Sequence, residues 1–176
     1  MTGEHLQAQA RRVVTGVNAE GKSIFVSDEP TPHRLAGPGN TKCDIWRTSA
    51  LPVALSDGDG IDEGVITEPP KGGIVFRQTT FAPDSEWDKS LGYSDSKGQL
   101  HGTIPAEQSG GVPGFHFTNS VDIVTVLDGE IVAVMETEEK VLRAGDSLIM
   151  RGVNHAWCNR TDKPVTVLAI MISADV

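Results

Sequence analysis

The fold is determined by two blocks in the C-terminal half, GGVPGFHFTNSVDIVTVLDG at 110–129 and GDSLIMRGVNHAWCN at 145–159. The first block contains His116, Thr118 and Asp122, and the second contains His155. Both combine glycine-bearing turns with runs of β-branched residues, which predicts paired strands. Because side chains alternate along a strand, His116 and Thr118 should share one face. If the faces of both blocks look into one barrel, two imidazoles meet there with Asp122 nearby.

Outward from these blocks, the chain contains many short β-prone runs and almost no helical periodicity. Strands are predicted at 11–14, 23–26, 43–48, 73–81, 121–127, 131–136, 140–142, 147–150, 155–159 and 165–172. NAEGK predicts a turn between the first two, and Asp128-Gly129 a tight hairpin turn. The stretches at 28–42 and 54–64 are expected to be loops, the second acidic and in solvent. The connection at 82–110 is long enough to cover a pocket as a lid. This pattern predicts an all-β barrel or sandwich.

Length and charge limit the classes of protein that need to be considered. A chain of 176 residues suits one domain, here 11–176, after a short helix or flexible tail at 1–10. The net charge of −9 disfavours binding to nucleic acid or to an anionic membrane. The N-terminal sequence lacks the apolar core of a signal peptide and no run is long enough to span a membrane, so a cytoplasmic location is expected. Cys43 and Cys158 are expected to be free thiols.

The order of residues in the two blocks resembles the two conserved motifs of the cupin superfamily. In the first block, Gly110, His116 and Gly129 keep the usual spacing, while Thr118 replaces a second histidine and Asp122 replaces a glutamate. In the second block, Gly152, His155 and Asn159 match the usual glycine, histidine and asparagine. The stretch from Gly145 to Gly152 is one residue shorter than in the usual motif and lacks the usual proline. The variant HFTNSVD with RGVNHAWCN is similar to a group of single-domain bacterial and fungal cupin-domain proteins that shares no single activity. The resemblance implies a jelly-roll-like β-barrel (double-stranded β-helix) with its core at 110–172 and extension strands at the N-terminus.

A mononuclear metal site is the first chemical expectation for this barrel. His116, Asp122 and His155 are the predicted ligands and catalytic residues, because two histidines and one carboxylate leave coordination positions open, as in non-heme Fe(II) oxygenases. One divalent ion of iron, manganese, zinc or nickel is expected, and no organic cofactor. Aspartate is shorter than glutamate, so Asp122 could instead cap a turn or pair with Arg151, and the barrel could then hold no metal.

Two arginines inside β-prone runs are candidates for binding a substrate. Arg77 or Arg47 on the barrel wall could anchor a carboxylate or an enolate. The alternative for each is an outward position on a strand, which is favoured for Arg47. Trp157 and Met150 are expected as core or as substrate-binding wall, and Thr118 as a weak oxygen ligand or a partner of metal-bound water.

Three functions remain open. The first is a dioxygenase-like oxidoreductase that cleaves a phenolic or enol-type small molecule. The second is a metal-free isomerase, cyclase or lyase in which His116 or His155 acts as base and Asp122 orients it. The third is a non-catalytic binder of a small metabolite, because one barrel hosts many functions. Exposed sheet edges predict a homodimer.

Overall fold

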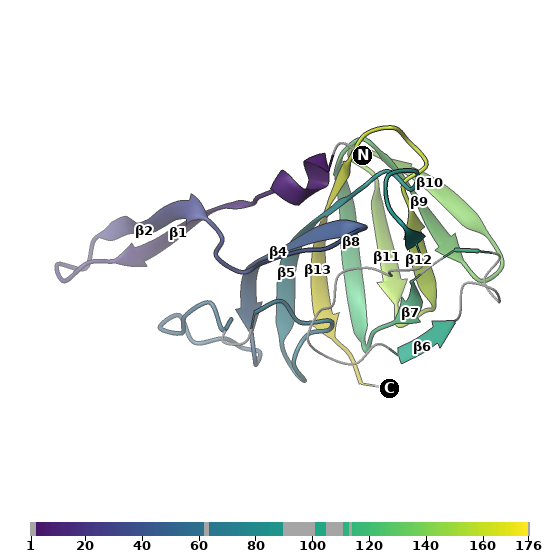
Figure 1. The fold of residues 1–176 in the computed structure, drawn as a ribbon. Helices are drawn as coiled ribbons and strands as arrows, with labels where there is room; N and C mark the ends of the chain where they lie inside the picture. Colours follow the sequence, from purple (N-terminus) through teal and green to yellow (C-terminus); the bar gives the residue numbers. More distant parts are fainter. Residues whose placement is uncertain (1–2, 62–63, 90–100, 105–110, 113, 176) are drawn as a thin grey trace.

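A computed structural model describes residues 3–61, 64–89, 101–104, 111–112 and 114–175. After a short 3-10 helix, η1, the described chain is built of strands (Figure 1). Their bounds are η1 Glu4–Gln7, β1 Arg11–Val17, β2 Ser23–Pro30, β3 Arg34–Ala36, β4 Asn40–Thr48, β5 Ile74–Phe81, β6 His101–Ile104, β7 Phe115–Phe117, β8 Ser120–Asp128, β9 Glu130–Met135, β10 Glu139–Arg143, β11 Ser147–Arg151, β12 His155–Cys158 and β13 Val165–Ser173. No helix in the described part of the chain is long and apolar enough to cross a membrane.

Two sheets form the barrel, and a separate hairpin precedes them. One sheet has the order β11-β8-β13-β5-β4-β3 and the other the order β10-β9-β12-β7-β6. β1 and β2 pair only with each other and extend away from the barrel (Figure 1). This arrangement confirms the predicted all-β barrel with extension strands at its N-terminus.

The main core lies between the sheets because alternate residues of the facing strands point inward. Val124 and Val126 of β8, Val167 of β13, Ile131 of β9 and Trp157 of β12 belong to one buried cluster. A second cluster forms on the opposite side of the five-stranded sheet, where Phe115, Val132 and Cys158 are buried. β9 and β12 are therefore buried on both faces, which explains their continuous apolar runs.

Three expected irregular segments are more ordered than predicted. The predicted loop at 28–42 contains the end of β2, all of β3 and the start of β4. The N-terminal segment packs on the barrel as a short helix rather than as a flexible tail, because His5 is buried and its Nε2 contacts the Gly37 carbonyl at 3.0 Å. In the acidic stretch Ala54–Gly58 is exposed, but Ile61 is buried.

The predicted lid is only partly described. Residues 83–89 turn along the end of β12, where the Asp84 amide donates to the Asn159 carbonyl at 2.7 Å. The Asn159 backbone amide in turn donates to the Asp84 carboxylate at 3.1 Å. β6 adds an edge strand beside β7. The positions 90–100 and 105–110 lie outside the described residues.

Candidate active site

Two histidines lie side by side on the inner face of the five-stranded sheet. β7 and β12 are antiparallel neighbours, and their register places His116 directly opposite His155. The ring centroids are 4.7 Å apart and the rings are tilted by 48°. The strand alternation that turns these rings inward sends Phe115 and Ala156 to the opposite cluster. The sequence therefore predicted correctly that the two motifs bring their histidines together.

Hydrogen bonds to the backbone set the tautomer of both rings. His116 Nδ1 lies 2.7 Å from the Gly114 carbonyl, and His155 Nδ1 lies 2.9 Å from the Val153 carbonyl. A carbonyl oxygen only accepts, so each Nδ1 carries the proton and each Nε2 keeps its lone pair. Within the described residues, neither Nε2 takes part in a hydrogen bond. Both rings are thus prepared to bind a metal ion or accept a proton at Nε2.

Burial keeps both rings uncharged at neutral pH. Desolvation, and then the neighbouring His155 ring, lower the pKa of His116 from 6.5 to about 4. Desolvation also lowers the pKa of His155. Neutral imidazoles are the form that coordinates metals and accepts protons.

Asp122 lies on the inner face of the other sheet and is held by hydroxyl groups. It is 5% exposed, and the Ser120 hydroxyl donates to its Oδ1 at 2.5 Å. The Thr118 hydroxyl is 3.4 Å from its Oδ2 and 2.7 Å from the Ser120 hydroxyl. Burial raises the pKa of Asp122, although these hydroxyls oppose the change. The pairing with Arg151 that the sequence left open does not form among the described residues, since Arg151 is exposed on the outer face.

The predicted set of three metal ligands is not assembled. Among the described residues, no three histidine, cysteine, aspartate or glutamate side chains gather closely enough to hold a metal ion. The physical reason is that Asp122 stands on the opposing sheet with a short side chain tied to Ser120. The donors that the structure does place together are the two imidazoles.

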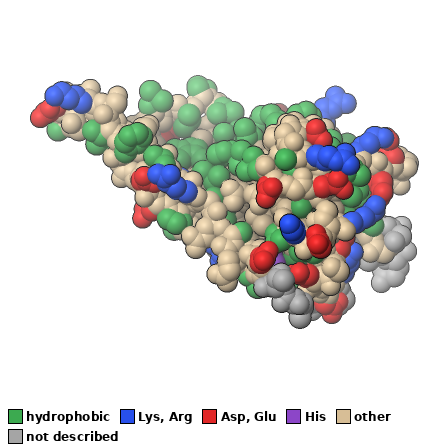
Figure 2. Space-filling model, turned by 90° about the horizontal axis from the view of Figure 1, so that it is seen from above, with side chains coloured by type: hydrophobic (Ala, Val, Ile, Leu, Met, Phe, Trp, Pro, Cys, Tyr) green, Lys and Arg blue, Asp and Glu red, His purple; other side chains and the backbone are tan. Residues whose placement is uncertain are grey.

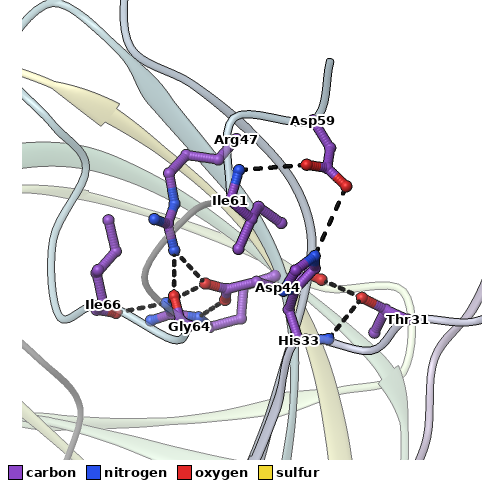
Figure 3. A network of polar contacts seen from close by, with 9 residues as sticks. Thr31, His33, Asp44, Arg47, Asp59, Ile61, Gly64 and Ile66 are labelled. Carbon is purple, nitrogen blue, oxygen red and sulfur yellow. Dashed lines mark hydrogen bonds and ion pairs between the residues drawn. The ribbon is translucent and has the colours of Figure 1, made fainter.

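Both predicted substrate-binding arginines are buried and engaged with the Asp44 carboxylate. Figure 3 labels Asp44 and Arg47. Arg77 donates to Asp44 from Nε at 2.5 Å and from Nη2 at 3.1 Å. Arg47 donates to Asp44 from Nη2 at 3.1 Å. The Nη2 groups also reach backbone carbonyls, that of Ile66 from Arg77 at 2.5 Å and that of Gly64 from Arg47 at 2.6 Å. The outward position favoured for Arg47 is wrong, because its side chain is buried in this Arg47–Asp44–Arg77 triad.

The triad also ties down the loop that follows β4. Asp59 accepts a hydrogen bond from the Arg12 side chain at 2.5 Å, and His33 Nε2 lies 3.6 Å from the same carboxylate. The Asp59 carbonyl accepts from the Arg47 amide at 2.9 Å. Part of the acidic stretch expected in solvent is therefore fixed to β1, to the segment before β3 and to Arg47. Figure 3 shows the contact between Asp59 and His33.

Sequence reasoning missed two charged residues of β4. Asp44 is fully buried and pairs in register with Arg77; an acidic residue inside a β-prone run was the available signal. Lys42 pairs in register with Thr79, which itself pairs with core residue Val167, so Lys42 shares their inward face. Its charge contributes to lowering the pKa of His116, which places it near the imidazole pair.

Trp157 and Met150 belong to the apolar part of the barrel. Both are in the main core cluster, and the Trp157 ring lies 6.1 Å from the Phe81 ring. Trp157 also meets His155 edge-on, with ring centroids 6.2 Å apart. Cys158 faces the other cluster, away from His155, and burial raises the pKa of its thiol to about 11.

Fold and site together define a small β-barrel with an imidazole pair on its inner wall. Residues 103–171 match the family described as the cupin domain. The chain is 30% identical over 169 residues to the cupin-domain-containing oxidoreductase fogC of Aspergillus ruber. This match covers 91% of this chain and 70% of the relative. It is 26% identical to the cupin-domain-containing oxidoreductase virC of Hypocrea virens, over 85% of this chain and 67% of the relative. The chain therefore belongs to the cupin superfamily.

Two solved structures match this chain at low identity and with TM-scores under 0.5. AerE from Microcystis aeruginosa matches with a TM-score of 0.47 and 15% identity, over 83% of this chain and 47% of that chain. A putative ethanolamine utilization protein of Salmonella typhimurium matches with a TM-score of 0.44 and 14% identity, over 96% of this chain and 99% of that chain.

Proposed function

We propose that this protein is an oxidoreductase that acts on a small organic molecule with one divalent transition metal held by His116 and His155. The observation that carries the proposal is the facing pair of neutral imidazoles, each with Nδ1 bonded to a carbonyl and Nε2 available. A metal-binding histidine commonly donates a hydrogen bond from its other ring nitrogen to a backbone carbonyl, which fixes the orientation of the ring. The oxidoreductase names of the fungal relatives agree with this function.

The residues present fit such an ion in part. Two imidazole nitrogens suit iron, manganese, nickel or zinc, and the remaining positions would be open to water or substrate. Asp122 is not a ligand in this proposal. When bound, iron or manganese would supply a redox-active Lewis acid at the imidazole pair.

The surrounding residues favour an anionic substrate of the enol or phenol type. Lys42 contributes positive charge near His116, and the Arg47–Asp44–Arg77 triad has two cations for one carboxylate. Trp157 and Met150 belong to the main core cluster, and in this proposal they would form the apolar wall against a ring or a chain of the substrate. Asp122, whose pKa is raised by burial, is the group that would hold or release a proton as the substrate ionises.

Metal titration of the purified, untagged full chain tests this proposal. Co(II) added to the metal-free protein should produce visible absorption bands at one equivalent, and Fe(II) with nitric oxide under anaerobic conditions should give a high-spin EPR signal. His116→Ala and His155→Ala should each lose both signals, whereas Asp122→Asn should keep them. His33→Ala, a histidine outside the barrel, is the matched control. Failure of the unmodified protein to bind either ion would overturn the metal-dependent proposal.

A second function is favoured by one observation: the buried Asp122 carboxyl interacts electrostatically with His116 although it does not join the imidazole pair in a ligand set. A buried carboxyl with a raised pKa near neutral imidazoles is a pattern of acid–base enzymes, because the two kinds of group are pushed toward opposite protonation states. Metal-free isomerisation or elimination would use these residues as base and acid. Turnover of an enol-type substrate that survives exhaustive chelation but is lost in Asp122→Asn would select this function.

A further inference from the structure

The β1–β2 hairpin presents apolar side chains to solvent along its length. Phe25 is 75% exposed, Val17 68% and Val26 56%, and Val13 and Ile24 are also exposed. The register places Phe25 beside Thr15 and Ile24 beside Gly16, so both faces of the ribbon contain apolar residues. A two-stranded hairpin by itself is marginally stable in water. We refer to residues 11–30 as the arm, and its composition indicates that something covers it.

A second uncovered apolar surface lies on the outer face of the six-stranded sheet. The strand registers align Ile149, Ile123, Ile170, Phe76 and Trp46 in one row across β11, β8, β13, β5 and β4. Ile149 is 54% exposed and Ile170 36%. Val121, Ile172 and Ile74 form a parallel row beside it. Figure 2 shows hydrophobic side chains along the arm and onto the adjoining face of the barrel.

Charge argues that the cover is a second copy of this chain. Two copies with a net charge of −9 each repel one another over most of their surfaces. The arm is an exception, since it contains three basic and three acidic residues and has no net charge. The outward positions of β5, β8 and β13 contain no charged residue. These two surfaces can therefore meet between copies without like-charge repulsion.

We propose that the protein forms a symmetric dimer in which the arm of each copy lies on the outer sheet face of the other. Arm and face are different surfaces of one chain, so a twofold axis lets both contacts form at once and closes the assembly. An arm of seven residue pairs is about 23 Å long and about 10 Å wide. Two arms on two faces would bury roughly 900 Å², close to the ~1,000 Å² expected of a specific interface.

Light scattering coupled to size-exclusion chromatography tests the dimer with two charge substitutions. Phe25→Asp on the arm and Ile170→Asp on the face should each weaken dimerisation about thirtyfold or more, because each buries an unpaired charge at an apolar centre. Val141→Asp is the matched control, since Val141 is 42% exposed on β10 of the other sheet. It should leave the dimer intact. Circular dichroism should show the native fold in the arm variant, because the arm lies outside both core clusters.

Disulfide trapping tests the arm-on-face geometry directly. Phe25→Cys and Ile170→Cys chains should form a covalent dimer rapidly when mixed, and much more slowly when either is oxidised alone. Cys43 and Cys158 are buried and should not interfere. A monomeric wild-type chain at tens of micromolar would overturn the proposal, as would a dimer that neither charge substitution weakens or a mixture that does not cross-link preferentially.

Discussion

At the scale of single residues, burial decides the chemistry of the barrel. His116 and His155 stay neutral because the protein around them solvates a charge poorly, and the Nδ1–carbonyl bonds then leave Nε2 as the reactive atom. The same burial raises the pKa of Asp122. Burial thus lowers the pKa of the two histidines and raises the pKa of the aspartate.

The depressed pKa of His116 predicts a loss of stability in acid. Below pH 6.5 the unfolded chain takes up a proton on this ring that the folded chain refuses until about pH 4. The free energy of unfolding should therefore fall as the pH drops from about 6.5 toward 4, and His155 should act in the same direction. Asp122 has the opposite sign, because its raised pKa favours the folded state in acid. Urea titrations of chelator-treated protein across this range measure the slope, which should decrease in His116→Gln; equal slopes would contradict the assignment.

Asp44 should be a major contributor to stability. Removing it leaves the guanidinium groups of Arg47 and Arg77 buried without a counter-charge. Asp44→Ala should lower the free energy of unfolding by about 3–5 kcal/mol. Chemical denaturation gives this value, and Asp28→Ala, which removes an exposed ion pair with Arg11, should cost much less. Similar losses in both variants would refute a special role for the triad.

At the scale of elements, the turns between strands determine which faces meet. Gly129 joins β8 to β9 with φ at +80°, so the chain passes from the six-stranded to the five-stranded sheet over a single residue. A turn at Asp128-Gly129 was predicted, since glycine accepts a positive φ without strain. The predicted hairpin is wrong, because β8 and β9 belong to different sheets and do not pair with each other. β7, in contrast, has three residues and was recognisable only through the motif that contains His116.

Substitution of Gly129 should destabilise the barrel. A Cβ at this position would lie 2.9 Å from the Val165 side chain, in addition to the cost of a left-handed backbone. Gly129→Ala should cost at least about 1–2 kcal/mol. Gly21→Ala is a suitable control, because this glycine has a similar φ of +77° but an added Cβ there would meet nothing within 4 Å. A larger thermal shift in the Gly21 variant would contradict this account.

At the scale of the whole molecule, an arm that extends from a barrel makes stability depend on assembly. Dimerisation stabilises only the folded chain, so the melting temperature should rise with protein concentration. Scanning calorimetry over a hundredfold concentration range should show an increase of a few degrees. Phe25→Asp should melt at one temperature throughout the range. A wild-type melting temperature that is independent of concentration would argue for a folded monomer.

The order of residues along the chain was enough to predict the barrel, most of its strands and the meeting of His116 with His155. These features depend on local alternation, turn residues and motif spacing. The packing of the two sheets accounts for the rest: it keeps Asp122 out of the ligand set, engages Arg47 and Arg77 with Asp44, and leaves the arm uncovered. Each of these depends on the distance between side chains from strands far apart in sequence, and no local pattern specifies such a distance.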